Sequence, residues 1–122
     1  RPCMLWNDTR AAAQAAAMAA VNDADYVAWC ADKNVELKAK VVTAPEGLGL
    51  PSIPSSANFI LTEFGRDQDT GAAAADAFLK SKGVIIRRMD GYGLPEYLRI
   101  SIGTDDECGA LIAALTEFRG QA

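Results

Sequence analysis

A chain of 122 residues that is 50% apolar and 23% charged is typical of one soluble globular domain with a modest core. Its net charge of −4 argues against a general nucleic-acid or acidic-membrane surface, so we expect neither partner. Histidine is absent, which excludes Ser-His and Cys-His nucleophilic arrangements and most metal sites built on imidazole.

The cysteines and the apolar runs bear on the cellular compartment. Cys3, Cys30 and Cys108 are odd in number and have no CxxC spacing, so we expect reduced packing residues rather than disulfides or a zinc site. No apolar run approaches the roughly 20 residues that a membrane helix needs. The alanine-rich start lacks the pattern of a signal peptide. We therefore expect a cytoplasmic protein.

The first half of the chain predicts two helices. After an expected extended arm over residues 1–7, the run RAAAQAAAMAAV (10–21), capped by Asp8 or Thr9, has high helix propensity. Residues 22–26 interrupt this helix, and a second one follows until Pro45, Gly47 and Gly49, with a bend over residues 48–56. The expected apolar face of the second helix is Tyr26, Val27, Cys30, Leu37 and Val41, and its expected solvent side is Lys33, Glu36, Lys38 and Lys40.

The next stretch predicts a strand and a helix. Residues 57–64 (ANFILTEF) form a nearly continuous apolar run, which predicts a strand that is covered on both faces, with Asn58 as the polar exception. A surface loop over residues 65–71 leads to a helix over 72–82, capped by Thr70 or Asp69 and ended by Gly83.

The sequence marks the N-terminus and the helical periodicity of the last helix most clearly. Thr104 and Glu107 have the spacing of a capping box, which marks a helix N-terminus. The apolar residues that follow recur at helical spacing: Cys108, Leu111, Ile112, Leu115 and Phe118.

Between the last two helices, the segment 83–104 predicts a β-hairpin. The runs VIIRR (84–88) and LRISI (98–102) are β-branched and alternating, and DGYGLPE (90–96) is rich in turn residues. A hairpin symmetric about Gly93 pairs Arg87 with Arg99. The same register pairs Ile86 with Ile100, Val84 with Ile102, and Ile85 with Ser101.

That register puts two arginines opposite each other on one face of the hairpin. Like charges directly opposite destabilise a sheet, so the pair suggests an anion bound between them, since guanidinium groups suit phosphate or carboxylate. The alternative is that each arginine pairs separately with a nearby carboxylate such as Glu63 or Glu96. Arg88 alternates to the opposite side and is expected at the surface.

The element order predicts the fold class. Helix, helix, strand, helix, hairpin and helix give an α+β, two-layer domain, with an antiparallel or mixed sheet of three to four strands and helices mainly on one face. We expect a single domain over residues 1–122, with a helical part (1–45) and a strand-helix-hairpin-helix part (50–122). The second part is also compatible with a ferredoxin-like half.

Several of these stretches, in this order, resemble one family. The most specific are SSANF (55–59) and GVIIRRMDGYGLPEYLRISIGT (83–104), which follow RP…N…AAAQAAAMAAVNDADYV and LGL. From about Arg1 to Phe118 the chain resembles the C-terminal small domain of histidinol-phosphate aminotransferases, which are fold-type I enzymes that use pyridoxal 5′-phosphate.

The resemblance implies roles for particular residues. Arg87 and Arg99 match family arginines that face the substrate and hold its phosphate, and the match of Arg99 binds the substrate carboxylate in related aminotransferases. Asn58 matches the asparagine of the family's ANF element, where a buried backbone clamp is the expected role and a substrate contact the alternative. Tyr92 lies in a loop that could reach the mouth of the site or could only pack or face solvent.

The chain also departs from the family pattern. Nothing in it resembles the surroundings of the cofactor lysine, the phosphate pocket, or the aspartate that holds the pyridine nitrogen. The lysines at 33, 38, 40, 80 and 82 are all expected on polar helical faces or ends. We therefore expect no catalytic, cofactor-binding or metal-binding residue in this chain, which by itself neither binds the cofactor tightly nor transaminates.

The function implied is substrate recognition and active-site closure within histidinol-phosphate:2-oxoglutarate aminotransferase of histidine biosynthesis. The implied partners are a large cofactor-binding domain, a small phosphorylated or carboxylated amino substrate, and a second copy in a homodimer. Alternatives with the same fold are threonine-phosphate decarboxylases and aromatic aminotransferases. An alternative of another class is a free-standing ferredoxin-like binding or interaction module without catalysis.

Overall fold

A computed structural model of the chain describes residues 18, 19 and 21–120. These residues divide into two compact units, with the boundary between Lys33 and Asn34. The arm predicted over residues 1–7 and most of the helix predicted over 10–21 lie outside the described residues. Met18, Ala19 and Val21, at the end of that predicted helix, are helical. Among the described residues, no helix is both long and apolar enough to cross a bilayer.

The first complete helix, α2, spans Ala24–Gly47. It begins where Asp23 caps it, because the Tyr26 N–H donates to Asp23 Oδ1 at 3.0 Å. It ends in a Schellman arrangement: the N–H groups of Gly49 and Leu50 donate to the carbonyls of Glu46 and Pro45, and Gly49 has a φ of 75°. Pro45 thus lies inside the last turn rather than ending the helix.

Only the later part of the predicted apolar face of α2 is buried. Leu37 and Val41 lie in the core, with 8% and 0% of their surface exposed. Tyr26 and Val27, which were predicted on the same apolar face, are 57% and 52% exposed in the described part of the chain.

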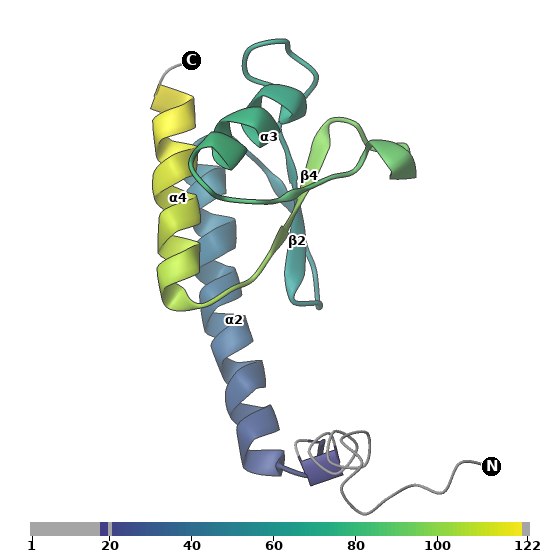
Figure 1. The fold of residues 1–122 in the computed structure, drawn as a ribbon, viewed down its shortest axis with the longest axis vertical. Coiled ribbons are helices and arrows are strands. Elements are labelled where there is room, and N and C mark those ends of the chain that lie inside the picture. Colours follow the sequence, from purple (N-terminus) through teal and green to yellow (C-terminus); the bar gives the residue numbers. More distant parts are fainter. Residues whose placement is uncertain (1–17, 20, 121–122) are drawn as a thin grey trace, which may run out of the picture. The chain divides into compact units, whose positions relative to one another are not determined.

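The sheet has four strands in the order β1-β2-β4-β3, and every neighbouring pair is antiparallel. Strands β2 and β4 lie side by side (Figure 1). The strands are β1 (Ser52–Ile53), β2 (Phe59–Glu63), β3 (Arg87–Arg88) and β4 (Tyr97–Ser101). Strand β1 lies in the stretch that was predicted to be only a bend. Within residues 34–120 the helices α2, α3 (Ala72–Ser81) and α4 (Asp105–Gly120) all contribute to the core on one face of this sheet, which confirms the predicted α+β class.

The core between helices and sheet follows the alternation of the strands. In β2, Ile60 and Thr62 are fully buried, whereas Phe59 and Leu61 on the other face are only half-buried. The buried hydroxyl of Thr62 is satisfied by the Ser52 hydroxyl at 2.8 Å. The prediction that β2 is covered on both faces therefore does not hold within the described chain. The helix-side core comprises Leu37, Val41, Leu50, Ile60, Phe64, Ala72, Ala75, Leu79, Leu98, Ile100, Cys108, Leu111, Ala114, Leu115 and Phe118.

The hairpin has the predicted register but a shorter first strand. Arg87 pairs with Arg99, and Arg88 with Leu98, as symmetry about Gly93 requires. Residues 84–86 are not part of the ladder, so the strand predicted over 84–88 is wrong for its first three residues. A cavity of about 370 Å³ is lined by residues 83–86 on one side and 100–103 with the start of α4 on the other, so the two segments do not pair there.

The loop before α3 is organised by Asp67 rather than by the predicted caps, Thr70 or Asp69. The Asp67 carboxylate accepts hydrogen bonds from the N–H of Asp69 and from the N–H and hydroxyl of Thr70, and these donors lower the pKa of Asp67. Gly71 is the N-cap and makes no side-chain cap hydrogen bond. A Cβ at Gly71 would lie 2.4 Å from the Asp67 carbonyl oxygen, so the tight loop requires glycine there.

Gly71→Ala should destabilise the protein by about 1–3 kcal/mol, because the new methyl group collides with backbone that cannot move independently. The matched control is Gly109→Ala in the interior of α4, where a Cβ would meet nothing within 4 Å. The control should stabilise by up to about 1 kcal/mol through helix propensity. Urea denaturation of both variants measures the difference, and equal effects would contradict the steric argument.

The capping box predicted at the start of α4 is present. Glu107 Oε2 accepts hydrogen bonds from the Thr104 N–H at 2.7 Å and from the Thr104 hydroxyl at 3.0 Å. In return the Glu107 N–H donates to the Thr104 hydroxyl oxygen at 3.4 Å. The hydrogen bond from the Thr104 N–H, followed by that from its hydroxyl, holds the pKa of Glu107 below its ordinary value of 4.5. The capping box therefore stabilises the ionised carboxylate.

This lowered pKa predicts a pH-dependent contribution to stability. Because the folded pKa of Glu107 is depressed, its contribution is complete above the ordinary value of 4.5 and is lost as the pH falls through the lower folded value. Glu107→Gln should therefore lower the melting temperature at neutral pH, and the melting curves of variant and parent should converge in acid. A difference that stays constant from neutral pH into acid would show that the charge is not responsible.

Candidate anion-binding site

The candidate site lies on the face of the sheet that points away from the helices, here called the open face. The strand register aligns Ile53, Leu61, Arg99 and Arg87 in one row across all four strands. The first two side chains in this row are apolar and partly exposed. The row ends in two guanidinium groups, which come from the neighbouring strands β4 and β3.

Arg99 is the more enclosed of the two arginines. It lies in β4, between β2 and β3, and is half-buried. Its guanidinium carbon is 5.1 Å from the centroid of the Phe59 ring, which belongs to the neighbouring strand. Its Nε is buried and has no hydrogen-bond partner within the described residues. A buried donor without a partner is costly, so this atom is suited to an acceptor that the described chain does not supply.

Arg87 lies at the edge of the sheet and is exposed. Its guanidinium carbon is 5.7 Å from the centroid of the Tyr92 ring, which belongs to the short 3₁₀ helix η1 (Asp90–Tyr92). Tyr92 is itself 62% exposed, so this contact between ring and guanidinium lies near solvent. Arg87 and Arg99 are thus both placed over aromatic rings.

The carboxylates that could have neutralised these arginines are engaged elsewhere. Glu96 accepts from Arg66 Nη2 at 2.8 Å and from Arg66 Nε at 3.1 Å. Glu63 accepts a hydrogen bond from the Tyr97 hydroxyl at 3.3 Å. Within residues 18–19 and 21–120, neither Arg87 nor Arg99 forms an ion pair, and the alternative pairing with Glu63 or Glu96 is wrong. Two arginines at directly paired positions, neither neutralised by a described carboxylate, suit a phosphate or carboxylate as a shared ligand.

The sequence prediction for Asn58 is wrong in one respect. Asn58 is exposed rather than buried, and it is its backbone carbonyl that accepts a hydrogen bond, from the Ile102 N–H at 2.8 Å. The expected backbone clamp is instead Lys38, whose Nζ donates to the carbonyls of Ser55 at 2.9 Å and Ala57 at 3.3 Å. Lys38 was predicted on the solvent side, because a helical period cannot show that a distant loop approaches that side chain.

The large cavity behind the hairpin is separate from this site. Its lining is mostly apolar, with Glu107 as the charged member, and neither Arg87 nor Arg99 contributes to it. Among the described residues, no group of three or more Cys, Asp or Glu side chains could hold a metal ion. The described cysteines, Cys30 and Cys108, are free thiols, and only Cys108 is buried. The open face is therefore the part of the described chain with the clearest ligand chemistry.

Comparison with known proteins identifies the family. The sequence profile of the family described as aminotransferase class I and II matches residues 4–115. The chain belongs to the class I and II aminotransferases. This aminotransferase chain is 43% identical over 112 residues to histidinol-phosphate aminotransferase of Granulibacter bethesdensis, covering 92% of the chain and 30% of the relative. It is 46% identical over 110 residues to that of Paramagnetospirillum magneticum, covering 90% of the chain and 30% of the relative.

Solved structures agree with the sequence comparison. Histidinol-phosphate aminotransferase of Sinorhizobium meliloti, in complex with pyridoxal 5′-phosphate, matches with a TM-score of 0.79 and 32% identity, over 88% of this chain and 29% of that one. A histidinol-phosphate aminotransferase assigned in Erwinia carotovora atroseptica matches with a TM-score of 0.76 and 26% identity, over 87% and 29% of the two chains. The aminotransferase chain thus spans about 30% of the length of the curated relatives it matches.

The described lysines of the aminotransferase chain do not fit the role of a cofactor lysine. Lys40, Lys80 and Lys82 form ion pairs at 2.6–2.7 Å with Asp105, Asp76 and Glu117. Lys38 donates to two carbonyls, and Lys33 also has an interaction partner. A lysine that forms a Schiff base needs a poorly solvated amine beside the cofactor ring, whereas these amines are engaged in structural contacts.

Proposed function

We propose that this chain is the small domain of a histidinol-phosphate aminotransferase, in which it binds the anionic end of the substrate and closes the active site. The observation that carries the proposal is the pair of opposed arginines, Arg87 and Arg99, which no described carboxylate neutralises. The names of the relatives support the substrate, because a phosphate ester is the kind of anion that two guanidinium groups hold well.

We propose that another domain of the complete enzyme holds the cofactor, because the described lysines are engaged in structural contacts. Pyridoxal phosphate, when bound, supplies the electron sink for transamination with 2-oxoglutarate. Since the described lysines do not fit it, we assign the cofactor to a large domain of the complete enzyme, which we propose to be a cytoplasmic homodimer. The half-buried open face, with Phe59 and Leu61, is the surface we propose to face that domain.

The two arginines are expected to contribute differently. Arg99 is half-buried and is supported by Phe59, so its interaction with an anion is screened less by water. Arg87 is exposed at the sheet edge and gains strength only when closure of the domains removes water from the site. We therefore assign to Arg99 the stronger interaction and to Arg87 the contact that completes the site on closure.

Replacement of either arginine in the complete enzyme should weaken use of histidinol phosphate. A hydrogen bond to a charged group is worth about 1.5–3 kcal/mol, so Arg99→Ala should lower kcat/KM by roughly 10- to 100-fold. Arg87→Ala should lower kcat/KM for histidinol phosphate less, because Arg87 is more exposed. It should hardly change kcat/KM for histidinol, which lacks the phosphate. Steady-state kinetics with both substrates provides the measurement, and an unchanged kcat/KM for Arg99→Ala would refute the assignment.

The 122-residue chain by itself should not bind the cofactor tightly. Titration of pyridoxal phosphate with the chain should produce no saturable change in the cofactor's absorbance at micromolar concentrations, because the described lysines are engaged in structural contacts. A saturable change that disappears when one lysine is replaced by arginine would contradict the proposed division of labour.

A further inference from the structure

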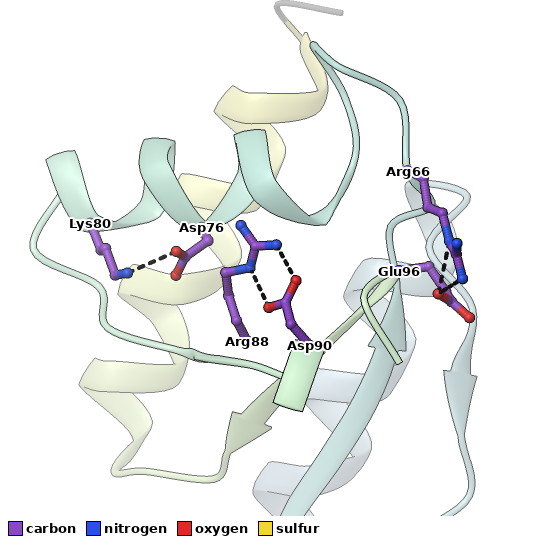
Figure 2. A network of polar contacts seen from close by, with 6 residues as sticks. All are labelled: Arg66, Asp76, Lys80, Arg88, Asp90 and Glu96. Atoms are coloured by element: carbon purple, nitrogen blue, oxygen red, sulfur yellow. Dashed lines mark hydrogen bonds and ion pairs between the residues drawn. The ribbon is translucent and has the colours of Figure 1, made fainter. Parts of the chain in front are cut away.

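Arg88 occupies the face of β3 opposite to Arg87 and takes part in a polar network that the anion site does not use. Its Nε donates to Asp90 Oδ2 at 2.8 Å, and its Nη2 donates to Asp90 Oδ1, so the pair is bidentate. Figure 2 shows the Arg88 guanidinium between Asp90, on η1, and Asp76, on α3. One arginine therefore lies at the meeting point of the strand, the loop and the helix.

Asp76 gives this network a buried negative charge. Only 6% of its surface is exposed; its Oδ2 accepts from Lys80 Nζ at 2.7 Å, and its buried Oδ1 has no hydrogen-bond partner within the described residues. The hydrogen bonds with Asp90 raise the pKa of Arg88, and the charge of Asp76 adds to this effect. The negative charges of Asp90 and Asp76 thus both favour the Arg88 guanidinium at this position.

The backbone alone holds this region weakly. Strand β3 pairs at only two positions, and residues 84–86 before it are outside the ladder. Strand β3 is also at the edge of the sheet, so it has one neighbouring strand. Its orientation therefore also depends on side-chain contacts, among them the Arg88–Asp90 pair, the Arg87–Tyr92 contact and Met89, which is 8% exposed.

The same contacts determine where the anion-binding groups lie. Asp90 is the first residue of η1 and Tyr92 is the last, so fixing Asp90 against Arg88 also fixes the ring beneath Arg87. Because successive side chains of a strand point to opposite faces, holding Arg88 on the helix side holds Arg87 on the open face.

We propose that Arg88 is a positioning residue, which holds β3 and η1 against α3 through Asp90 and Asp76 and thereby keeps Arg87 and Tyr92 in place for the substrate phosphate. This inference rests on the proposed function of Arg87. The Arg88 and Asp90 side chains are 37% and 46% exposed, and ion pairs with that exposure add little to stability. Their loss should consequently alter substrate binding more than folding.

The test uses the complete enzyme with Arg88→Met, which keeps the apolar stem, and Asp90→Asn, which keeps the shape but loses the charge. Both should raise KM for histidinol phosphate by about tenfold, less than the hundredfold that a misplacement of about 1 Å can cost. We expect kcat to change by less than about twofold, and kcat/KM for histidinol to stay unchanged. Arg88→Lys should restore part of the lost affinity, because it keeps one charged donor.

Arg66→Met is the matched control. Arg66 also donates its Nε and Nη2 to a carboxylate, that of Glu96, but it lies in the loop before α3 rather than in β3 (Figure 2). This variant removes the same charge and one ion pair, and it should leave KM unchanged for both substrates. Melting temperatures of all variants show whether folding is affected.

The following outcomes would overturn the inference about Arg88. An equal fall in kcat/KM for histidinol phosphate and for histidinol would show a general structural effect. A rise in KM in Arg66→Met as large as that in Arg88→Met would show the same. A normal KM in Arg88→Met, with Arg87→Ala impaired, would refute the role of Arg88 while leaving the proposed function intact. A normal KM in Arg87→Ala would overturn both. If Arg88→Met fails to fold, the nearly isosteric Asp90→Asn variant gives the decisive KM.

Discussion

The opposition of Arg87 and Arg99 across β3 and β4 is the constraint on which the rest of this structure depends. Two like charges at directly paired positions repel each other, so the unliganded sheet carries an unfavourable interaction at its edge. The opposite face offsets this cost, because Leu98 and Ile100 are buried against the helices. The fold thus supports a repulsive pair on one face with apolar packing on the other, and an anion between the arginines would relieve the repulsion.

The aromatic rings beneath the arginines explain how two cations remain available. A carboxylate partner would hold a guanidinium equally well, but it would also neutralise it and compete with an incoming anion. Phe59 and Tyr92 attract the guanidinium groups through their ring faces and leave the N–H edges able to donate. The carboxylates near the hairpin are kept away, because Glu96 binds Arg66 and Asp90 binds Arg88 on the other side of the strand.

The features that the sequence predicts correctly are those set by local spacing. The hairpin register follows from symmetry about Gly93, the start of α4 from the Thr104–Glu107 box, and the end of α3 from Gly83, whose φ is 79°. The features that it misses depend on the approach of distant segments. Lys38 reaches a loop 17 and 19 residues away, and the side of β2 that is covered depends on which helices pack against it. No local pattern marks such contacts before the chain is folded.

Both edges of the sheet are two-residue strands, β1 and β3, and this limits how the domain can associate with other chains. A long exposed edge is a template on which another chain can add a strand, and it is a common start of aggregation. Here Pro51 and Pro54 flank β1, and proline cannot donate a backbone hydrogen bond to a new strand. At the other edge, the chain turns into η1 directly after Met89. A domain with such short sheet edges can therefore expose the sheet without offering it for intermolecular pairing.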